Sequence, residues 1–371
     1  MSKKIGVITF HSAHNYGAFL QTYALQQFLK KRGYDSEVIN YRNRIIDNSF
    51  KLYHINKPGL NGAIYSIVRD TLFLRKNIKR YKTFEKSIKK CFKLTRKYNS
   101  NEELIKNPPE EDIYITGSDQ VWSYYLLSDL EDSYTLNFGR KDSIKRISYA
   151  ASAGDSEVIL EHRQKFCDKL KGIDFISVRE VETQKILNEI LDKKVELVLD
   201  PTLLLEKKEW ENEIKDKVEK EKYILVYTIG MHEENAKVAN YLARKTGYKI
   251  IHFERTNRFE NTLKSEYGAD PFTFIRLIKN AEYVVTTSFH ATVFSIIFNK
   301  KFWVIEPPKA SNRIKTLLDI VNLENRMIST LDELKTKDFN EEIIYDEKKM
   351  NNLQKEQELS SKWLINAIEG E

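Results

Sequence analysis

Residues 284–298 read VVTTSFHATVFSIIF, and this stretch decides how the chain is expected to fold. It opens with a short apolar run typical of a buried strand, passes through small polar residues to His290, and ends in an apolar run typical of a helix. Such a junction belongs to an α/β domain, in which ligands bind outside the carboxyl ends of the strands. Backbone N–H groups at the helix start attract phosphate or carboxylate. The stretch therefore combines a titratable histidine with a site for a small anionic substrate.

The same alternation of strand and helix extends along both halves of the chain. Strands are expected at residues 4–10, 36–41, 112–116, 145–151, 174–178, 195–198, 223–227, 249–253, 283–286 and 302–305. Helices are expected at residues 18–32, from 183 onward, and at 233–246, 271–280, 292–298 and 346–368, while 40–104 is expected to be mostly helical. Alternating elements predict parallel sheets with right-handed crossovers. The fold class is therefore α/β, with two Rossmann-like domains facing a cleft.

The length and composition set limits on the kind of protein. A chain of 371 residues exceeds one comfortable core, so we expect an N-terminal domain at 1–205, a C-terminal domain at 206–345 and a bracing C-terminal helix at 346–371. No run of about 18 apolar residues occurs, so no membrane-spanning helix is expected. The short apolar run near the N-terminus favours a first strand over a signal peptide. Cytoplasmic location is the default expectation.

The basic residues are concentrated in one segment. Residues 75–97 hold eleven lysines and arginines and a single acid, Glu85, within a chain whose formal net charge is +7. Apolar residues recur there every three or four positions, which predicts an amphipathic helix. One interpretation is a solvated basic face. Another is peripheral contact with anionic lipid at the inner face of the membrane, or with a lipid-linked acceptor. Nucleic-acid binding is not favoured, because no aromatic-rich recognition module accompanies the charge.

Polar residues follow several of the expected strands. Gly117, Ser118, Asp119 and Gln120 come after the third strand, where they can contact a ligand or cap the next helix. Ser152 ends the fourth strand, and Arg179 follows the fifth. A guanidinium at that point can hold a carboxylate or phosphate in two hydrogen bonds, or form a structural ion pair with a neighbouring glutamate. Asn15, Tyr16 and Gly17 form the turn before the first helix and can bind an acceptor or serve only as a turn.

The second half offers further candidates. His290 can act as a general acid or base near neutral pH, or can cap or pack against the helix that follows. Lys309 and Arg313 lie just after the last expected strand, as ligand-binding cations or as solvated loop charges. No metal site and no cofactor are expected. His11 and His14 lack nearby acidic or cysteine partners, Cys91 and Cys167 form no paired motif, and no dinucleotide fingerprint occurs.

Six short motifs, taken together and in order, resemble the polysaccharide pyruvyl transferase family over about residues 5–318. They are NYGA at 15–18 with LQTYAL at 20–25, GSDQVW at 117–122, YAAS at 149–152, SVRE at 177–180, DPT at 200–202 and SFHA at 288–291. The resemblance implies a two-domain arrangement like that of the GT-B glycosyltransferases. It also implies transfer of a pyruvyl group from phosphoenolpyruvate to two hydroxyls of one sugar, forming a cyclic ketal and releasing phosphate.

Under this resemblance, His290 and Arg179 are the expected catalytic residues. The C-terminal domain would bind phosphoenolpyruvate through Ser288, Phe289, Arg313 and Lys309, and the N-terminal domain would bind a sugar or a lipid-linked oligosaccharide acceptor. Many family members carry arginine at the position of Ser288 and glycine at that of Ala291. Losing the arginine removes a bidentate anion clamp, so either another cation replaces it or the donor differs. A glycosyltransferase using a nucleotide sugar, and a non-catalytic member of a polysaccharide locus, are the alternatives.

Overall fold

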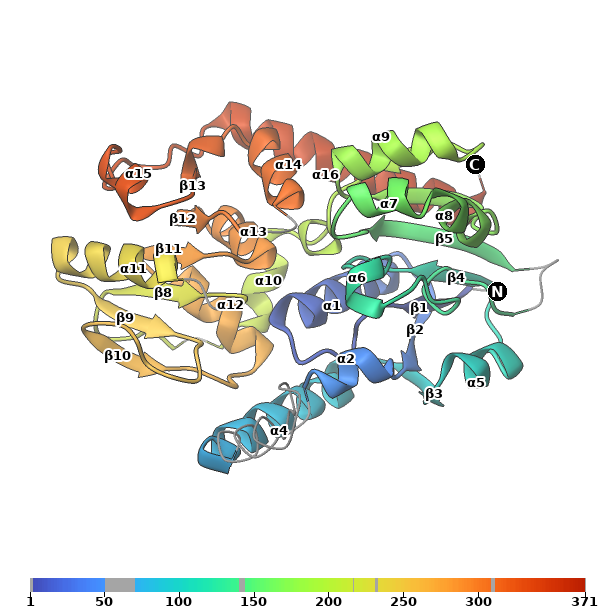
Figure 1. The fold of residues 1–371 in the computed structure, drawn as a ribbon, viewed down its shortest axis with the longest axis horizontal. Helices are drawn as coiled ribbons and strands as arrows, with labels where there is room; N and C mark the ends of the chain where they lie inside the picture. The colour runs from blue at the N-terminus through green and yellow to red at the C-terminus, as the bar shows by residue number, and fades with distance from the viewer. Residues whose placement is uncertain are drawn as a thin grey trace. The chain divides into compact units, whose positions relative to one another are not determined.

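The computed structural model describes residues 3–50, 71–139, 144–215, 217–230, 233–307 and 311–370. The described residues of Met1–Lys51, Glu85–Leu205 and Gln354–Glu371 form one compact unit. Those of Leu52–Phe84 and Glu206–Leu353 form the second (Figure 1). The second unit thus takes in a segment from the N-terminal half of the chain, which a division at residue 205 does not include. No described helix has both the length and the apolar character needed to cross a bilayer.

The first unit is built on a seven-stranded sheet with the order β3-β2-β1-β4-β5-β6-β7. The strands are β1 (Lys4–Ile8), β2 (Asp35–Tyr41), β3 (Leu94–Tyr98), β4 (Ile113–Thr116), β5 (Lys145–Ala151), β6 (Phe175–Val178) and β7 (Val195–Leu197). Every pairing between these strands is parallel. The strand order reverses direction between β1 and β4. In an open α/β sheet, this reversal opens a crevice for a ligand at the carboxyl ends of the two strands.

The helices of the first unit connect these parallel strands. They are α1 (Tyr16–Lys31), α2 (Arg44–Asn48), α5 (Asn101–Lys106), α6 (Tyr124–Leu127), α7 (Glu157–Glu161), α8 (Arg163–Leu170) and α9 (Val181–Ile190), with a 3₁₀ turn at Pro201–Leu203. Helix α1 ends before Gly33, whose φ of +81° lies in the left-handed region that glycine adopts without penalty. The core includes the fully buried Trp122, whose indole Nε1–H donates to the carbonyl of Tyr134 at 3.1 Å.

The second unit repeats the same design. Its six-stranded sheet has the order β10-β9-β8-β11-β12-β13, again with parallel pairings. The strands are β8 (Tyr223–Tyr227), β9 (Lys249–His252), β10 (Thr262–Ser265), β11 (Tyr283–Thr286), β12 (Lys301–Ile305) and β13 (Met327–Ile328). The helices are α10 (Lys207–Glu213), α11 (Glu233–Thr246), α12 (Pro271–Lys279), α13 (Phe289–Ile297), α14 (Asn312–Ile320) and α15 (Leu331–Lys335), with a 3₁₀ turn at Glu324–Arg326. Here the order reverses between β8 and β11, so residues 287–290 follow a strand at the reversal.

Two helices carry residues of both units. Residues 75–91 of the basic segment lie in α4 (Leu74–Cys91), which confirms the predicted amphipathic helix for that part, whereas the end of the segment enters β3. The last helix is α16 (Glu347–Glu369). Its part from Gln354 onward packs on the first unit: Ser360 Oγ accepts from the N–H of Leu199 at 2.9 Å, and Gln357 Nε2 donates to the carbonyl of Leu203 at 2.8 Å.

The structure corrects two of the predicted elements. Strand β3 lies within the segment that was expected to be mostly helical. Its five residues pair with β2 at the edge of the sheet but show no clear alternation of apolar and polar residues, so no local pattern indicated a strand. Helix α13 begins at Phe289 and not at Thr292. The reason is that Ser288 serves as its N-cap, which starts the helix directly after a small polar residue. His290 consequently lies in the first helical turn.

Candidate functional site

The loop before α13 is braced by two threonine side chains. Thr286 Oγ1 donates to the carbonyl of Tyr227 at 2.6 Å and accepts from the N–H of Ser288 at 2.9 Å. Thr287 Oγ1 accepts from the N–H of Ile229, also at 2.9 Å. These bonds join the ends of β8 and β11, the two strands between which the sheet order reverses. The turn that carries His290 is therefore held rigidly at the place where this fold class binds ligands.

His290 is the second residue of α13 and is only 6% exposed. Its ring meets that of Phe289 edge-on, with centroids 5.1 Å apart and an interplanar angle of 84°. The first N–H groups of an α-helix have no acceptor within the helix. Ser288 Oγ accepts one of them, from Ala291, at 3.4 Å. Ser288, Phe289 and His290 are thus brought together at a capped helix start, in an arrangement suited to a small anion.

Arg313 also reaches this turn. It is the second residue of α14, is partly buried, and its guanidinium carbon lies 5.9 Å from the centroid of the Phe289 ring. A cation over an aromatic face at this distance is attracted by the ring quadrupole, which orients the side chain. The structure therefore places Arg313, one of the two cations that could replace the arginine missing at position 288, beside Phe289. The other candidate, Lys309, lies outside the described residues.

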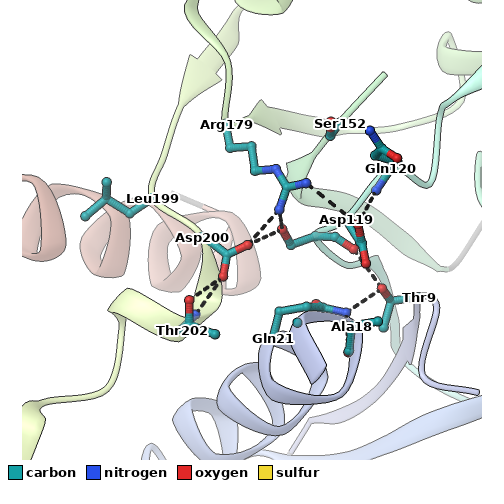
Figure 2. A network of polar contacts seen from close by, with 12 residues as sticks. Thr9, Ala18, Gln21, Asp119, Gln120, Ser152, Arg179, Leu199, Asp200 and Thr202 are labelled. Atoms are coloured by element: carbon teal, nitrogen blue, oxygen red, sulfur yellow. Dashed lines mark hydrogen bonds and ion pairs between the residues drawn. The ribbon is translucent and has the colours of Figure 1, made fainter. Parts of the chain in front are cut away.

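In the first unit, residues 117–120 lie at the end of β4, beside the end of β1. Thr9 Oγ1 donates to the carbonyl of Ser118 at 2.7 Å, and Gln21 Nε2 donates to Thr9 Oγ1 at 2.9 Å. Asp119 has a φ of +85°, and its carbonyl accepts from the N–H of Ser152 at 3.1 Å. Gly117, Ser118, Asp119, Gln120 and Ser152 therefore gather at the carboxyl ends of β4 and β5. Figure 2 shows Asp119, Gln120 and Ser152 there.

Arg179 is the centre of a buried polar network. Its Nη1 donates to Asp200 Oδ2 at 2.8 Å (Figure 2) and to Ser118 Oγ at 2.9 Å. Its Nε contacts Glu180 Oε1 at 3.3 Å. Asp119 lies 3.8 Å from Nη2. Burial alone would lower the pKa of Arg179, but the carboxylates of Glu180, Asp200 and Asp119 outweigh it and raise that pKa. In this structure the guanidinium thus organises the loop after β4, and its predicted role toward a substrate anion stays a prediction.

Sequence reasoning missed Asp200 as a member of this network. Asp200 follows β7, and its second oxygen accepts from both the N–H and the hydroxyl of Thr202 at 3.0 and 2.6 Å. The available signal was the Asp-Pro-Thr motif at a strand end, which resembles a helix start as much as a site. Only the fold brings this carboxylate to Arg179.

The residues predicted as the turn before α1 form the start of that helix. The side-chain oxygen of Asn15 accepts from the N–H groups of Gly17 and Ala18, at 2.8 and 3.2 Å, so Asn15 caps the helix. Tyr16 and Gly17 are buried in the first turn. This capping explains the motif structurally, and acceptor binding by these residues stays a prediction.

A second polar network that the sequence did not indicate surrounds the two histidines of the β1–α1 loop. His14 Nε2 lies 3.3 Å from Glu85 Oε1, and Arg42 Nη1 lies 3.1 Å from the same oxygen. Burial, together with the charge of Arg42, lowers the pKa of His11 to about 4. Both histidines thus have protein partners, and among the described residues no group of three or more metal-ligating side chains forms.

Solved structures with the same fold belong to sugar-nucleotide enzymes. A putative UDP-N-acetylglucosamine 2-epimerase from Listeria monocytogenes aligns with a TM-score of 0.55 at 10% identity, covering 100% of this chain and 96% of that chain. The UDP-GlcNAc 2-epimerase from Neisseria meningitidis, bound to UDP-GlcNAc, aligns with a TM-score of 0.54 at 12% identity over 100% of both chains. At such identities the likeness concerns the fold alone. It confirms the predicted class of two Rossmann-like domains of GT-B type.

Sequence comparison adds the family. A search of curated protein sequences gave no match. The family model for polysaccharide pyruvyl transferase, in contrast, matches residues 15–308. This range includes the turn before α1, the Arg179 network and the His290 turn. The chain therefore belongs to the polysaccharide pyruvyl transferase family.

Proposed function

We propose that this protein transfers a pyruvyl group from phosphoenolpyruvate to two hydroxyls of one sugar in a cell-surface polysaccharide or its precursor. The product is a cyclic pyruvate ketal, and phosphate is released. Membership of the transferase family supports the general reaction. The observation that carries the specific proposal is the His290 turn, where a histidine, a capped helix start and Arg313 occupy one strand end at the reversal of the sheet.

The donor would be held in the second unit. Phosphoenolpyruvate carries a carboxylate and a phosphate, so its site needs cationic and N–H donors. The start of α13 supplies helix N–H groups. Arg313 supplies a guanidinium that can form two parallel hydrogen bonds to either anion. Arg313 would thus take the part of the arginine that many family members carry where this chain has Ser288.

The chemistry requires one proton to be delivered and two to be removed. His290, as imidazolium, would protonate the methylene carbon of phosphoenolpyruvate, which leaves an oxocarbenium-like centre at carbon two. The first sugar hydroxyl attacks that carbon and loses its proton. The bond from carbon two to the phosphate oxygen then breaks, phosphate departs, and the second hydroxyl closes the ketal as it loses its proton. Imidazole suits these transfers because its ordinary pKa lies near neutral pH.

The acceptor sugar would be bound by the first unit. Residues 117–120, Ser152 and the Asn15 turn present hydroxyl, amide and backbone groups at neighbouring strand ends. These groups, together with the carboxylate of Asp119, suit sugar hydroxyls, which both donate and accept hydrogen bonds. Arg179 would position the residues after β4 through its hydrogen bonds to Ser118 and Asp200. It would contact a substrate anion only if one of these bonds to the protein were broken.

The test is phosphate release from phosphoenolpyruvate in the presence of candidate sugar acceptors, with the ketal methyl group followed by NMR. His290→Ala should abolish turnover while its thermal unfolding stays close to that of the unchanged protein. His162→Ala, which removes a partly exposed histidine between α7 and α8, is the matched control and should remain active. Full turnover by the His290 variant would remove His290 from the mechanism.

Ligand-dependent stability separates this proposal from its alternatives. A ligand at about 100 times its dissociation constant stabilises the folded state by roughly 2.7 kcal/mol. Stabilisation by phosphoenolpyruvate would support pyruvyl transfer. A shift only with nucleoside diphosphates would instead support a glycosyltransferase, and no shift with any of these anions would support a non-catalytic role.

A further inference from the structure

Helix α4 presents a continuous row of exposed cations. Arg75, Lys79, Lys82, Lys86, Lys89 and Lys90, here named the α4 basic stripe, are all exposed. They are spaced by alternating steps of four and three residues, with Lys90 adjoining the last. At 3.6 residues per turn this spacing keeps the six side chains within about 100° of arc on one face. These positions run from the second residue of α4 (Leu74–Cys91) to its last but one, and the helix is labelled in Figure 1.

The opposite face of α4 is buried. Asn77, Phe84 and Ile88 lie there and are not available to a partner. Just beyond the helix, Phe92 packs against Phe19 with ring centroids 4.7 Å apart. The apolar side chains of this amphipathic helix are therefore already used by the protein itself. Any partner of the exposed face must be recognised by charge and not by apolar insertion.

The described part of the chain supplies no acidic partner to the stripe. Among the residues that the structure describes, none of the six cations forms an ion pair. The one acid of the segment, Glu85, is instead held by Arg42 and His14. Burial raises the pKa of Glu85, yet the hydrogen bonds from His14 and Arg42 lower it to about 2. The net charge of residues 75–97 is larger than the net charge of the whole chain, so the remainder of the chain is net negative. The net positive charge of the chain thus comes from this segment.

We propose that the α4 basic stripe docks the protein on the surface of an anionic phospholipid bilayer. Five of the six cations are lysines, which act as flexible point charges and suit a layer of separate phosphate headgroups. The helix spans 18 residues, or about 27 Å, so one face can contact several headgroups at once. This inference rests on the charge of α4 and does not depend on the proposed pyruvyl transfer.

The same observations disfavour nucleic acid as the partner. Proteins that hold single strands combine cations with aromatic side chains on which bases stack. On α4 the phenylalanine is turned inward, and Tyr81 is the single exposed aromatic residue among the described residues of this helix. Reading of a duplex uses Asn, Gln or Arg side chains that reach base edges. Asn77 is buried, and the stripe offers a single arginine.

The test uses the full chain and sedimentation with lipid vesicles. Vesicles of phosphatidylcholine with 30% phosphatidylserine, roughly the charge of a strongly anionic leaflet, are compared with pure phosphatidylcholine. We expect binding to the anionic vesicles alone, lost when salt is raised to about 0.5 M because the Debye length then falls to a few ångströms. The triple variant Lys79→Glu, Lys82→Glu and Lys86→Glu should bind at least roughly 100-fold more weakly, at about fivefold for each lysine removed.

A matched variant separates the stripe from net charge. Lys185→Glu, Lys208→Glu and Lys355→Glu make the same change in charge at exposed positions on α9, α10 and α16, and should bind as the unchanged protein does. The corresponding lysine-to-glutamine triple on α4 removes the same three lysines without adding acidic groups, so it separates loss of charge from misfolding. It should also lose most of the affinity. Equal binding to both kinds of vesicle, equal losses in the two glutamate triples, or binding of oligonucleotides in place of vesicles would each overturn the proposal.

Discussion

Arg179 and Asp200 form a buried ion pair, with 2.8 Å between Nη1 of the guanidinium and Oδ2 of the carboxylate. The two residues follow β6 and β7, and both also contact Ser118 after β4. Strands β4 and β6 are not neighbours, since β5 lies between them. The pair thus links the carboxyl ends of strands across the sheet and holds the loop of residues 117–120 in place.

Removing the charge of Asp200 should destabilise the first unit strongly. Asp200→Asn would leave the buried guanidinium of Arg179 with fewer acidic partners, and breaking a buried pair in this way costs about 3–5 kcal/mol. Chemical denaturation measures the loss. Asp132→Asn is the control, because Asp132 pairs with Lys169 nearer the surface and such pairs contribute about 1 kcal/mol or less. Equal losses in the two variants would show that Arg179 does not depend on Asp200.

The buried His11 should make stability depend on pH. Burial and then the charge of Arg42 lower its pKa from 6.5 to about 4, so the unfolded chain binds a proton near pH 6.5 while the folded protein does not. Between these two values the unfolded state holds more protons, and stability therefore falls as the pH is lowered from 6.5 to 4, by about 3 kcal/mol in total. Unfolding free energies measured across this range test the slope.

His11→Gln should flatten that slope, because glutamine does not titrate but can still donate to Asn40, which lies 3.2 Å from His11 Nε2. His162→Gln serves as the control and should leave the slope between pH 6.5 and 4 in place. An unchanged slope in the His11 variant would assign the acid sensitivity to other groups.

A methyl group at Gly154 should disturb Gln120. The Cβ of Gly154→Ala would lie 2.8 Å from Gln120 Nε2, closer than a van der Waals contact allows, so the amide must move. Gly33→Ala is the matched control: φ is +78° at Gly154 and +81° at Gly33, but a Cβ at Gly33 meets nothing within 4 Å. Both variants should lose about 1–2 kcal/mol from the left-handed backbone.

The two glycine variants should differ in activity. Because Gln120 belongs to the proposed acceptor site, Gly154→Ala should raise the KM for the sugar while Gly33→Ala does not. Steady-state kinetics at saturating phosphoenolpyruvate would show the difference. If the acceptor KM is the same in both, Gln120 is not an acceptor ligand.

Loss of Arg313 should weaken donor binding. A hydrogen bond to a charged group contributes about 1.5–3 kcal/mol, so Arg313→Ala should raise the KM for phosphoenolpyruvate roughly 10- to 100-fold. Arg313→Lys should recover only part of this, because lysine lacks the planar fork. Lys315→Ala on the same helix removes an exposed cation that pairs with Glu306, and should change the KM little. Similar effects of the two alanine variants would argue against a specific role of Arg313.

Periodicity in the sequence was sufficient to predict most of the fold. Strands β5, β8 and β11 and helix α11 have the predicted bounds, because buried parallel strands are short apolar runs and α11 is clearly amphipathic. The short edge strands β3, β10 and β13 were not predicted. Each pairs on one side only; β3 and β10 carry few apolar residues, and β13 has only two residues, so their structure depends on the neighbouring strand and not on a local pattern.

For the site, the sequence by itself determined which residues stand at strand ends, since a polar residue after an apolar run marks the carboxyl end of a parallel strand. That was enough to select His290, Arg179 and residues 117–120. Only the tertiary structure decided what those residues contact. Asp200 meets Arg179 from the end of the neighbouring strand, Ser118 meets both of them from beyond β5, and Arg313 meets Phe289 from a separate helix. Contacts between residues distant in the chain depend on strand order and helix packing, which no local pattern of residue types encodes.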